Sequence, residues 1–159
     1  MVRWIRRLVG FLLIALGAIG AVFLIGMRRK SPVVQDNVRR FNRAVTNPRV
    51  LKTAGTKGAS ASIIHHVGRT TGRSHATPIG PFAVGEGFVI ALPYGPGADW
   101  VRNVLASGSA TLVHEGATIP IDRPEVVPVT LVVDDLPASQ QRMLRVFGVE
   151  ECLRVQRAA

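Results

Sequence analysis

The chain has 159 residues, of which 47% are hydrophobic and 19% are charged, and it contains one cysteine. These values exclude collagen-like, disulfide-stapled and intrinsically disordered proteins. The formal net charge of +10 is unevenly divided: residues 1–57 carry twelve Lys and Arg against Asp36 alone, whereas residues 58–159 carry eight against nine acidic residues. Because the larger part of the chain is almost neutral, we expect no nucleic acid among its partners.

The first predicted element is a membrane anchor at residues 1–30. An uncharged run of 20 residues extends from Leu8 to Met27, long enough to cross roughly 30 Å of hydrocarbon as a helix. A cleaved signal peptide is the alternative, but the basic triplet at residues 28–30 follows the run in place of a small-residue cleavage site. Six basic residues follow the run up to Arg43 and three precede it. The charge bias therefore predicts a single pass through the cell membrane, with the soluble domain on the cytoplasmic side.

The second predicted element is a basic amphipathic helix within residues 31–57. Ser31 and Pro32 form a typical helix start, and Asn47-Pro48 is expected to end the helix. Its apolar residues share one face, so they either pack on the domain, with the arginines in solvent, or lie on an anionic leaflet. They are Val34, Val38, Phe41 and Val45.

Residues 58–159 are predicted to form a small antiparallel barrel, mainly β with helices (α+β). The absence of a long βαβ alternation argues against a doubly wound nucleotide fold. One helix is expected over Trp100–Ser107, capped by Asp99 and ended by Gly108. A closing helix is expected from about Ala138 to Arg157, which Gly148 could interrupt. The expected strands are Ser60–Val67, His75–Val84, Gly87–Leu92, Ala110–His114, Ala117–Asp122 and Glu125–Val133.

Two segments concentrate residues that could bind a ligand. The first, residues 67–75, has two arginines, hydroxyl groups and two glycines between predicted strands, a composition that suits an anion such as phosphate. It lacks the lysine and spacing of a Walker loop, and an exposed polar turn is the alternative interpretation. The second, residues 91–103, leads from a strand through a Gly/Pro-rich loop to a helix N-terminus, which suits negative charge or a planar polar ligand.

Metal binding and nucleophilic catalysis have no support in the sequence. The four histidines show no metal-ligand spacing, and His65 and His66 are expected on opposite faces of one strand. There is no Gly-x-Ser-x-Gly elbow, and Cys152 is expected to be a small buried residue. We therefore assign no metal site and no catalytic side chain.

The order of the motifs resembles the deazaflavin-dependent nitroreductase family. The similarity lies in residues 68–78, Leu92-Pro93-Tyr94-Gly95 and residues 99–103, and extends over roughly residues 38–135. The resemblance implies a split β-barrel, FMN-binding-like in fold, over residues 58–159. It also implies hydride transfer from reduced coenzyme F420 to a quinone, nitro compound or activated alkene. FMN is the alternative cofactor, because similar barrels bind it.

The resemblance also implies roles for individual residues. Arg69, Thr70, Thr71, Gly72 and Arg73 would bind the phosphate and acidic tail of the cofactor. The ring system would be held by six further residues: Thr77, Pro78, Tyr94, Gly95, Trp100 and Asn103.

With the anchor, these motifs predict a membrane-bound reductase of a lipophilic acceptor. The partners expected are the lipid bilayer, that small-molecule acceptor and a second copy in a homodimer. The alternative is a non-catalytic membrane-surface barrel that binds a flavin-like, lipid or haem-like ligand.

Overall fold

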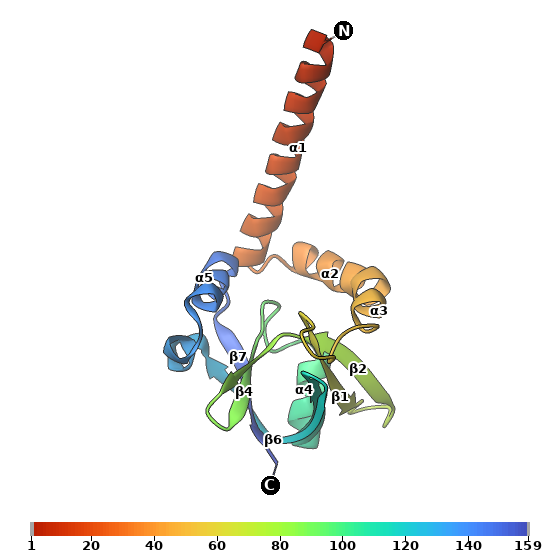
Figure 1. The fold of residues 1–159 in the computed structure, drawn as a ribbon, viewed down its shortest axis with the longest axis vertical. Helices are drawn as coiled ribbons and strands as arrows, with labels where there is room; N and C mark the ends of the chain where they lie inside the picture. Colours follow the sequence, from red (N-terminus) through yellow and green to blue (C-terminus); the bar gives the residue numbers. More distant parts are fainter. Residues whose placement is uncertain (1, 159) are drawn as a thin grey trace.

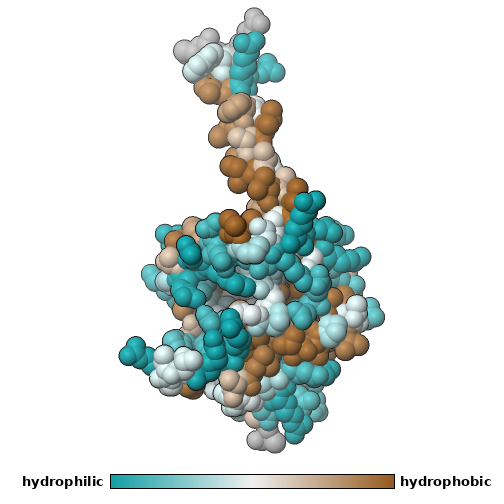
Figure 2. All heavy atoms as spheres, turned by 180° about the vertical axis from the view of Figure 1, so that it is seen from behind, coloured by the Kyte–Doolittle hydropathy of each residue, from teal (hydrophilic) through white to brown (hydrophobic). Residues whose placement is uncertain are grey.

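The computed structural model describes residues 2–158 and begins with a long apolar helix, α1 (Val2–Arg28). Among the described residues it is the one helix long and apolar enough to cross a membrane. Its side chains lie outside the domain until Gly26 and Met27, which are buried. In Figure 1, α1 rises from the end of the domain where α2, α3 and α5 gather. Figure 2 shows it as an apolar column above a largely hydrophilic body.

The base of α1 is docked closely on the domain. A Cβ placed on Gly26 would lie 2.5 Å from Cγ2 of Val34, so the glycine allows the next helix to approach α1. Lys30 forms an ion pair with Glu150. Arg28 packs beside Gly148, where the chain leaves α5. These contacts fix the direction in which α1 leaves the domain.

The basic helix is longer than the sequence predicts. Helix α2 (Pro32–Phe41) continues through a π-helical turn, η1 (Asn42–Thr46), into α3 (Asn47–Val50). The expected end at Asn47-Pro48 is therefore wrong. Asn47 N–H donates to the carbonyl of Asn42, a five-residue step that widens the helix just before Pro48, which has no N–H to contribute.

The remaining chain forms one seven-stranded sheet in which all neighbouring strands are antiparallel. Its strand order is β2-β1-β5-β6-β7-β4-β3. Two tight turns match the expected hairpins, one at Gly85-Glu86 and one at Glu115-Gly116. The strands are β1 (Ser62–Val67), β2 (Ser74–Ile79), β3 (Pro81–Val84), β4 (Gly87–Ala91), β5 (Ser109–His114), β6 (Ala117–Pro128) and β7 (Glu151–Arg157).

The sheet must curl because its two edge strands are joined by one residue. β2 ends at Ile79, β3 begins at Pro81, and Gly80 alone separates them. In a flat sheet these edges would lie about 29 Å apart, at roughly 4.8 Å per strand spacing. A one-residue connection spans only about 7 Å. The joined ends of the two edge strands therefore meet at Gly80, and the sheet curls into an open barrel with a corner there.

Helices complete the core on both faces of this sheet. Helix α4 (Asp99–Ser107) inserts Val101 and Val104 into the barrel interior, where both are fully buried. The outer face of β4 and β7 is covered by two 3₁₀ turns, η2 (Val129–Leu131) and η3 (Val133–Asp135), and by α5 (Ala138–Phe147). The predicted α+β barrel preceded by an apolar helix is confirmed.

The expected closing helix is only half correct. It ends at Phe147, and Gly148 adopts a left-handed φ of 62°. The next residues form β7, which pairs with both β4 and β6 and buries Leu153 and Val155. Pairing on both sides decides the conformation here over the helical pattern of the sequence. Cys152 is fully buried as expected, although in a strand and not in a helix.

Two other strand boundaries differ from expectation. The expected strand His75–Val84 is divided at Gly80 into β2 and β3. The segment expected at 117–122 and the first part of that expected at 125–133 form one bent strand, β6, with a bulge between Asp122 and Glu125, whereas residues 129–131 form the 3₁₀ turn η2. Arg123 has a positive φ of 49° within that bulge, which allows the strand to bend without ending.

Candidate functional site

The two predicted segments meet near the corner where the sheet closes. A slot of about 190 Å³ lies between the ends of β2 and β4, the loop after β4 and the start of α4. Its lining is mainly apolar and includes Pro78, Gly80, Leu92, Tyr94, Gly95 and Trp100. Because the lining comes from the edge strand β2, from β4 next to the other edge, and from a helix, the slot depends on the curling of the sheet.

The glycine-bounded loop between β1 and β2 is a compact turn held by its own backbone. Gly68 N–H donates to the carbonyl of Arg73, and Gly72 N–H donates to the carbonyl of Gly68. Gly72 adopts a φ of 67°, a conformation that suits glycine. The Thr71 hydroxyl accepts a bond from the Arg73 backbone and so serves the turn itself. Thr70 and Arg73 extend from this frame into solvent.

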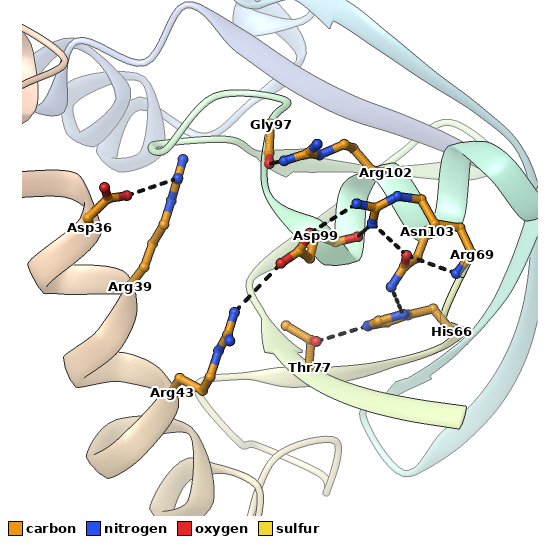
Figure 3. A network of polar contacts seen from close by, with 10 residues as sticks. All are labelled: Asp36, Arg39, Arg43, His66, Arg69, Thr77, Gly97, Asp99, Arg102 and Asn103. Atoms are coloured by element: carbon orange, nitrogen blue, oxygen red, sulfur yellow. Dashed lines mark hydrogen bonds and ion pairs between the residues drawn. The ribbon is translucent and has the colours of Figure 1, made fainter. Parts of the chain in front are cut away.

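Arg69 joins this loop to the start of α4. Its backbone N–H and its guanidinium both donate to Oδ1 of Asn103, at 3.2 and 2.9 Å. The same guanidinium lies 3.3 Å from a carboxylate oxygen of Asp99 (Figure 3). Asp99 is therefore an ion-pair partner, and its expected role as N-cap is wrong because Ala98 occupies that position without a side-chain bond.

Helix α2 and the turn after it reach the same site, which the sequence did not predict. Arg39 donates to the carbonyl of Tyr94 at 2.7 Å, and Asn42 donates to the Tyr94 phenol oxygen at 2.9 Å. Arg43 lies 3.7 Å from Asp99 (Figure 3). The expectation that these arginines are simply solvated is wrong for Arg39, which is half-buried. The basic helix thus holds the Tyr94 loop in place.

Burial changes the protonation behaviour of two groups at the site. It raises the pKa of the Tyr94 phenol, against smaller opposing effects of the Asn42 hydrogen bond and the Arg39 charge. It also lowers the pKa of His66, and the neighbouring His75 and His65 lower that pKa further. Both side chains are therefore neutral at physiological pH.

The structure brings most of the sequence-selected residues to one side of the barrel. Pro78, Tyr94, Gly95 and Trp100 line the slot. Asn103 is buried beneath the loop of residues 68–73 between β1 and β2, called the arginine loop below. Thr77 lies on β2 beside His66, with 3.1 Å between the Thr77 hydroxyl and Nε2 of His66. Among the described residues, the guanidinium of Arg73 makes no ion pair or hydrogen bond. It is the cation of the loop that is free to meet a ligand.

Four residues of the site were missed as site residues by sequence reasoning: Arg39, Asn42, Arg43 and His66. The first three are more than 50 positions from the Tyr94–Asp99 segment that they contact, and no local spacing reveals such contacts. His66 carried one usable signal, its place on the inward face of a strand. A histidine there requires buried partners.

A larger hollow of about 610 Å³ lies elsewhere on the barrel. It is formed by the β3–β4 hairpin, β7 and the 3₁₀ turns, and it includes Phe88, Leu131 and Arg157. None of the sequence-selected residues lines it. We take the smaller slot as the candidate site because it adjoins a helix N-terminus and the arginine cluster, which is formed by Arg43 and Arg69 around Asp99.

The slot and the cluster together suit a flat ligand with a negatively charged extension. The apolar walls favour a ring, and Arg43 and Arg69 share the single carboxylate of Asp99. Arg73, in the same loop as Arg69, adds an exposed positive charge. Among residues 2–158, no group of three or more His, Cys, Asp or Glu side chains is placed to hold a metal ion. The geometry provides binding and orientation for such a ligand.

Comparisons with known proteins add the following. No protein-family model and no curated protein matches the sequence. Among solved structures, the chain is similar to one titled "Structure of F420-H2 Dependent Reductase (FDR-A)", at 14% identity over 61% of this chain and 94% of that chain, with a TM-score of 0.44. A second structure, titled a domain-swapped dimer, is similar at 16% identity over 76% of this chain and 98% of that chain, also with a TM-score of 0.44.

Proposed function

We propose that the protein is a membrane-anchored reductase that uses reduced coenzyme F420 and passes hydride to a lipophilic acceptor such as a quinone, nitro compound or activated alkene. The observation that carries the proposal is the meeting of two distant glycine-containing segments. Arg69 of the first segment bonds to Asp99 and Asn103 of the second, beside the Trp100 slot. These are the segments on which the resemblance to deazaflavin-dependent enzymes rests.

The residues present fit such a cofactor. An apolar slot next to an arginine cluster matches a planar ring joined to a phosphate-linked acidic tail. The slot volume of about 190 Å³ is below the roughly 300–1,000 Å³ of typical ligand sites. We therefore infer that it takes part of the ring system and leaves the remainder accessible to the acceptor.

When bound, the reduced deazaflavin supplies the hydride, so this chain need not supply a nucleophile or a base. Arg73 and the backbone N–H groups of Thr70 and Thr71 bind negative charge, since the N–H groups of Gly68, Arg69 and Gly72 are already used within the protein. Trp100, Pro78 and Tyr94 hold the ring from the apolar side and exclude water from it. Arg39 and Asn42 keep Tyr94 in position, so α2 and η1 act as the support of the slot.

A location at the membrane would favour a lipophilic acceptor. We infer that α1 crosses the cell membrane once, with the domain on the cytoplasmic side, as the basic residues beyond Met27 favour. The Tyr94 loop contacts α2, and α2 lies beside the base of α1 (Figure 1). The slot is then close to the bilayer, where apolar acceptors are concentrated. In this proposal residues 1–30 anchor, 31–57 support the slot and 58–159 bind the cofactor, in a chain that forms a homodimer.

Titration of the fluorescent oxidised cofactor tests the proposal. The full chain, purified in detergent, is expected to bind in the micromolar range. Arg73→Ala is expected to weaken binding by about 1.5–3 kcal/mol, the usual value of a charged hydrogen bond. Arg142→Ala, on the exposed surface of α5, removes the same charge away from the slot and serves as the matched control.

Each outcome separates the alternatives. Binding of FMN in place of the deazaflavin would show that the cofactor is FMN, and the assignment of the binding site would stand. Binding without oxidation of the reduced cofactor by any acceptor would favour the non-catalytic barrel. Equal effects of Arg73→Ala and Arg142→Ala on binding would show that the arginine loop is not part of the binding site.

A further inference from the structure

A chain of buried hydrogen bonds connects the arginine loop to β2. Its central members are His66 and Asn103, two of the few buried polar side chains of the barrel, with 6% of their surface exposed. Nδ2 of Asn103 lies 3.2 Å from Nδ1 of His66, and Nε2 of His66 lies 3.1 Å from the hydroxyl of Thr77. Figure 3 shows these contacts as one line from Arg69 to Thr77.

The direction of the first bond follows from Arg69. Its backbone N–H and its guanidinium can only donate, and both contact the same side-chain atom of Asn103. That atom must therefore be the amide oxygen. The amide nitrogen of Asn103 then faces His66, and an amide nitrogen can only donate.

The direction of the remaining bonds follows in turn. Because Asn103 donates to Nδ1 of His66, that nitrogen carries no proton, and the neutral ring holds its proton on Nε2. Nε2–H therefore donates to the oxygen of Thr77. Among the described residues this is the one hydrogen bond that the Thr77 hydroxyl makes. Its own proton is left free to donate, and the side chain is partly exposed beside Pro78 of the slot.

We propose that Thr77 is a hydrogen-bond donor of the site, which offers its hydroxyl proton to a ligand acceptor, either a ring carbonyl oxygen or an unprotonated ring nitrogen. His66 and Asn103 are positioning residues that set this polarity from Arg69. The inference deepens the proposed function and rests on it for the identity of the ligand.

The surroundings of His66 favour the neutral ring that this polarity needs. From β2, His75 stacks on it at 5.6 Å, and His65 is its neighbour on β1. From α4 and the arginine loop, it faces the Asn103 amide and, beyond it, Arg69, whose charge is shared with Asp99. A second proton on His66 would place Nδ1–H against the Asn103 N–H, so the chain of bonds would break at low pH.

The proton position can be measured without any cofactor. Nitrogen NMR of imidazole-labelled full-length protein in detergent is expected to show His66 protonated on Nε2 alone near neutral pH. Asn103→Asp, at a pH where the ring is neutral, is expected to move the proton to Nδ1, because a carboxylate can only accept. A wild-type ring protonated on Nδ1 would overturn the proposed polarity.

Binding of oxidised F420 tests the donor itself. Thr77→Val, close to threonine in shape, is expected to weaken binding about five- to tenfold, the scale of one neutral hydrogen bond. Thr77→Ser is expected to restore it, and Asn103→Asp to reproduce the loss at the pH of the NMR measurement. Retained NMR spectra of the other histidines show that each variant is folded.

The two failures can be told apart. If wild type binds the cofactor and Thr77→Val binds it equally, the donor inference fails and the proposed function stands. If wild type binds no deazaflavin, the proposed function fails and the ligand assignment of Thr77 falls with it, while the imidazole spectrum still decides the polarity of the chain.

Discussion

Asp99 is the one acidic residue within the arginine cluster, and it limits the charge available to a ligand. It shares its carboxylate between Arg43 and Arg69. We expect Asp99→Asn to strengthen binding of an anionic cofactor about two- to tenfold, because a negative charge is removed while the helix start is kept. The effect should shrink as salt is raised. Asp134→Asn, on exposed η3, is the matched control, and tighter binding in both variants would show a general charge effect.

His66 also makes stability depend on pH. Its pKa in the folded chain lies below the value of about 6.5 in the unfolded chain, because burial penalises the charged ring. The unfolded state therefore takes up the proton first, and the folded state loses stability as pH falls from 6.5 through the lowered pKa. Above 6.5 this contribution is constant.

Thermal unfolding at about pH 5.5 and pH 7.5 checks this expectation. The wild-type melting temperature should fall more between these pH values than that of His66→Gln, which has no such group to protonate. Parallel shifts in the two proteins would mean that His66 does not contribute.

At the scale of elements, the junction of α1 and α2 depends on one small residue. Gly26→Ala would force Val34 away, since the added Cβ would lie 2.5 Å from Cγ2. We expect a loss of about 1–3 kcal/mol, the usual result of overpacking. Gly20→Ala, in the same helix, meets nothing within 4 Å and should be neutral.

Comparison of unfolding in detergent measures the difference between these two variants. Val34→Ala in addition to Gly26→Ala should recover part of the loss because it restores the space. Equal stability of Gly26→Ala and Gly20→Ala would show that α1 is not packed on α2.

Local pattern was sufficient for most elements of this fold. The hairpins at 85–86 and 115–116 and the end of α4 at Gly108 follow from turn residues and helix caps that the sequence displays. The sequence did not predict β7, because its conformation is decided by pairing with β4 and β6. It also did not reveal how Pro48 is accommodated, since the π turn before it has no sequence signature.

In the candidate site too, the sequence predicted the residues of local motifs and missed those that depend on long-range contacts. Residues of the two glycine-containing segments were selected from composition, and the structure places Arg69 against Asp99 and Asn103. The contribution of α2 to the Tyr94 loop was not predicted, because contacts between residues 52 or more positions apart leave no local pattern. The arginines of that helix suggested solvent or lipid, whereas one of them supports the slot.

In the whole molecule, the sheet turns a corner at Gly80, and a slot lies beside it. The apolar helix α1 leaves the end of the domain where α2, α3 and α5 gather (Figure 1). The arrangement predicts that cofactor comes from water and acceptor from the bilayer. Moving the domain away from the membrane should therefore reduce turnover of bilayer acceptors more than turnover of soluble ones.

Oxidation of reduced F420 by the full chain in lipid nanodiscs tests the central claim most directly. With a quinone in the bilayer, we expect the oxidised cofactor's fluorescence to recover at a rate that depends on the quinone and falls at least tenfold in Arg73→Ala under limiting cofactor. A rate that is unchanged by the quinone, or no oxidation by a chain that remains folded, would contradict it.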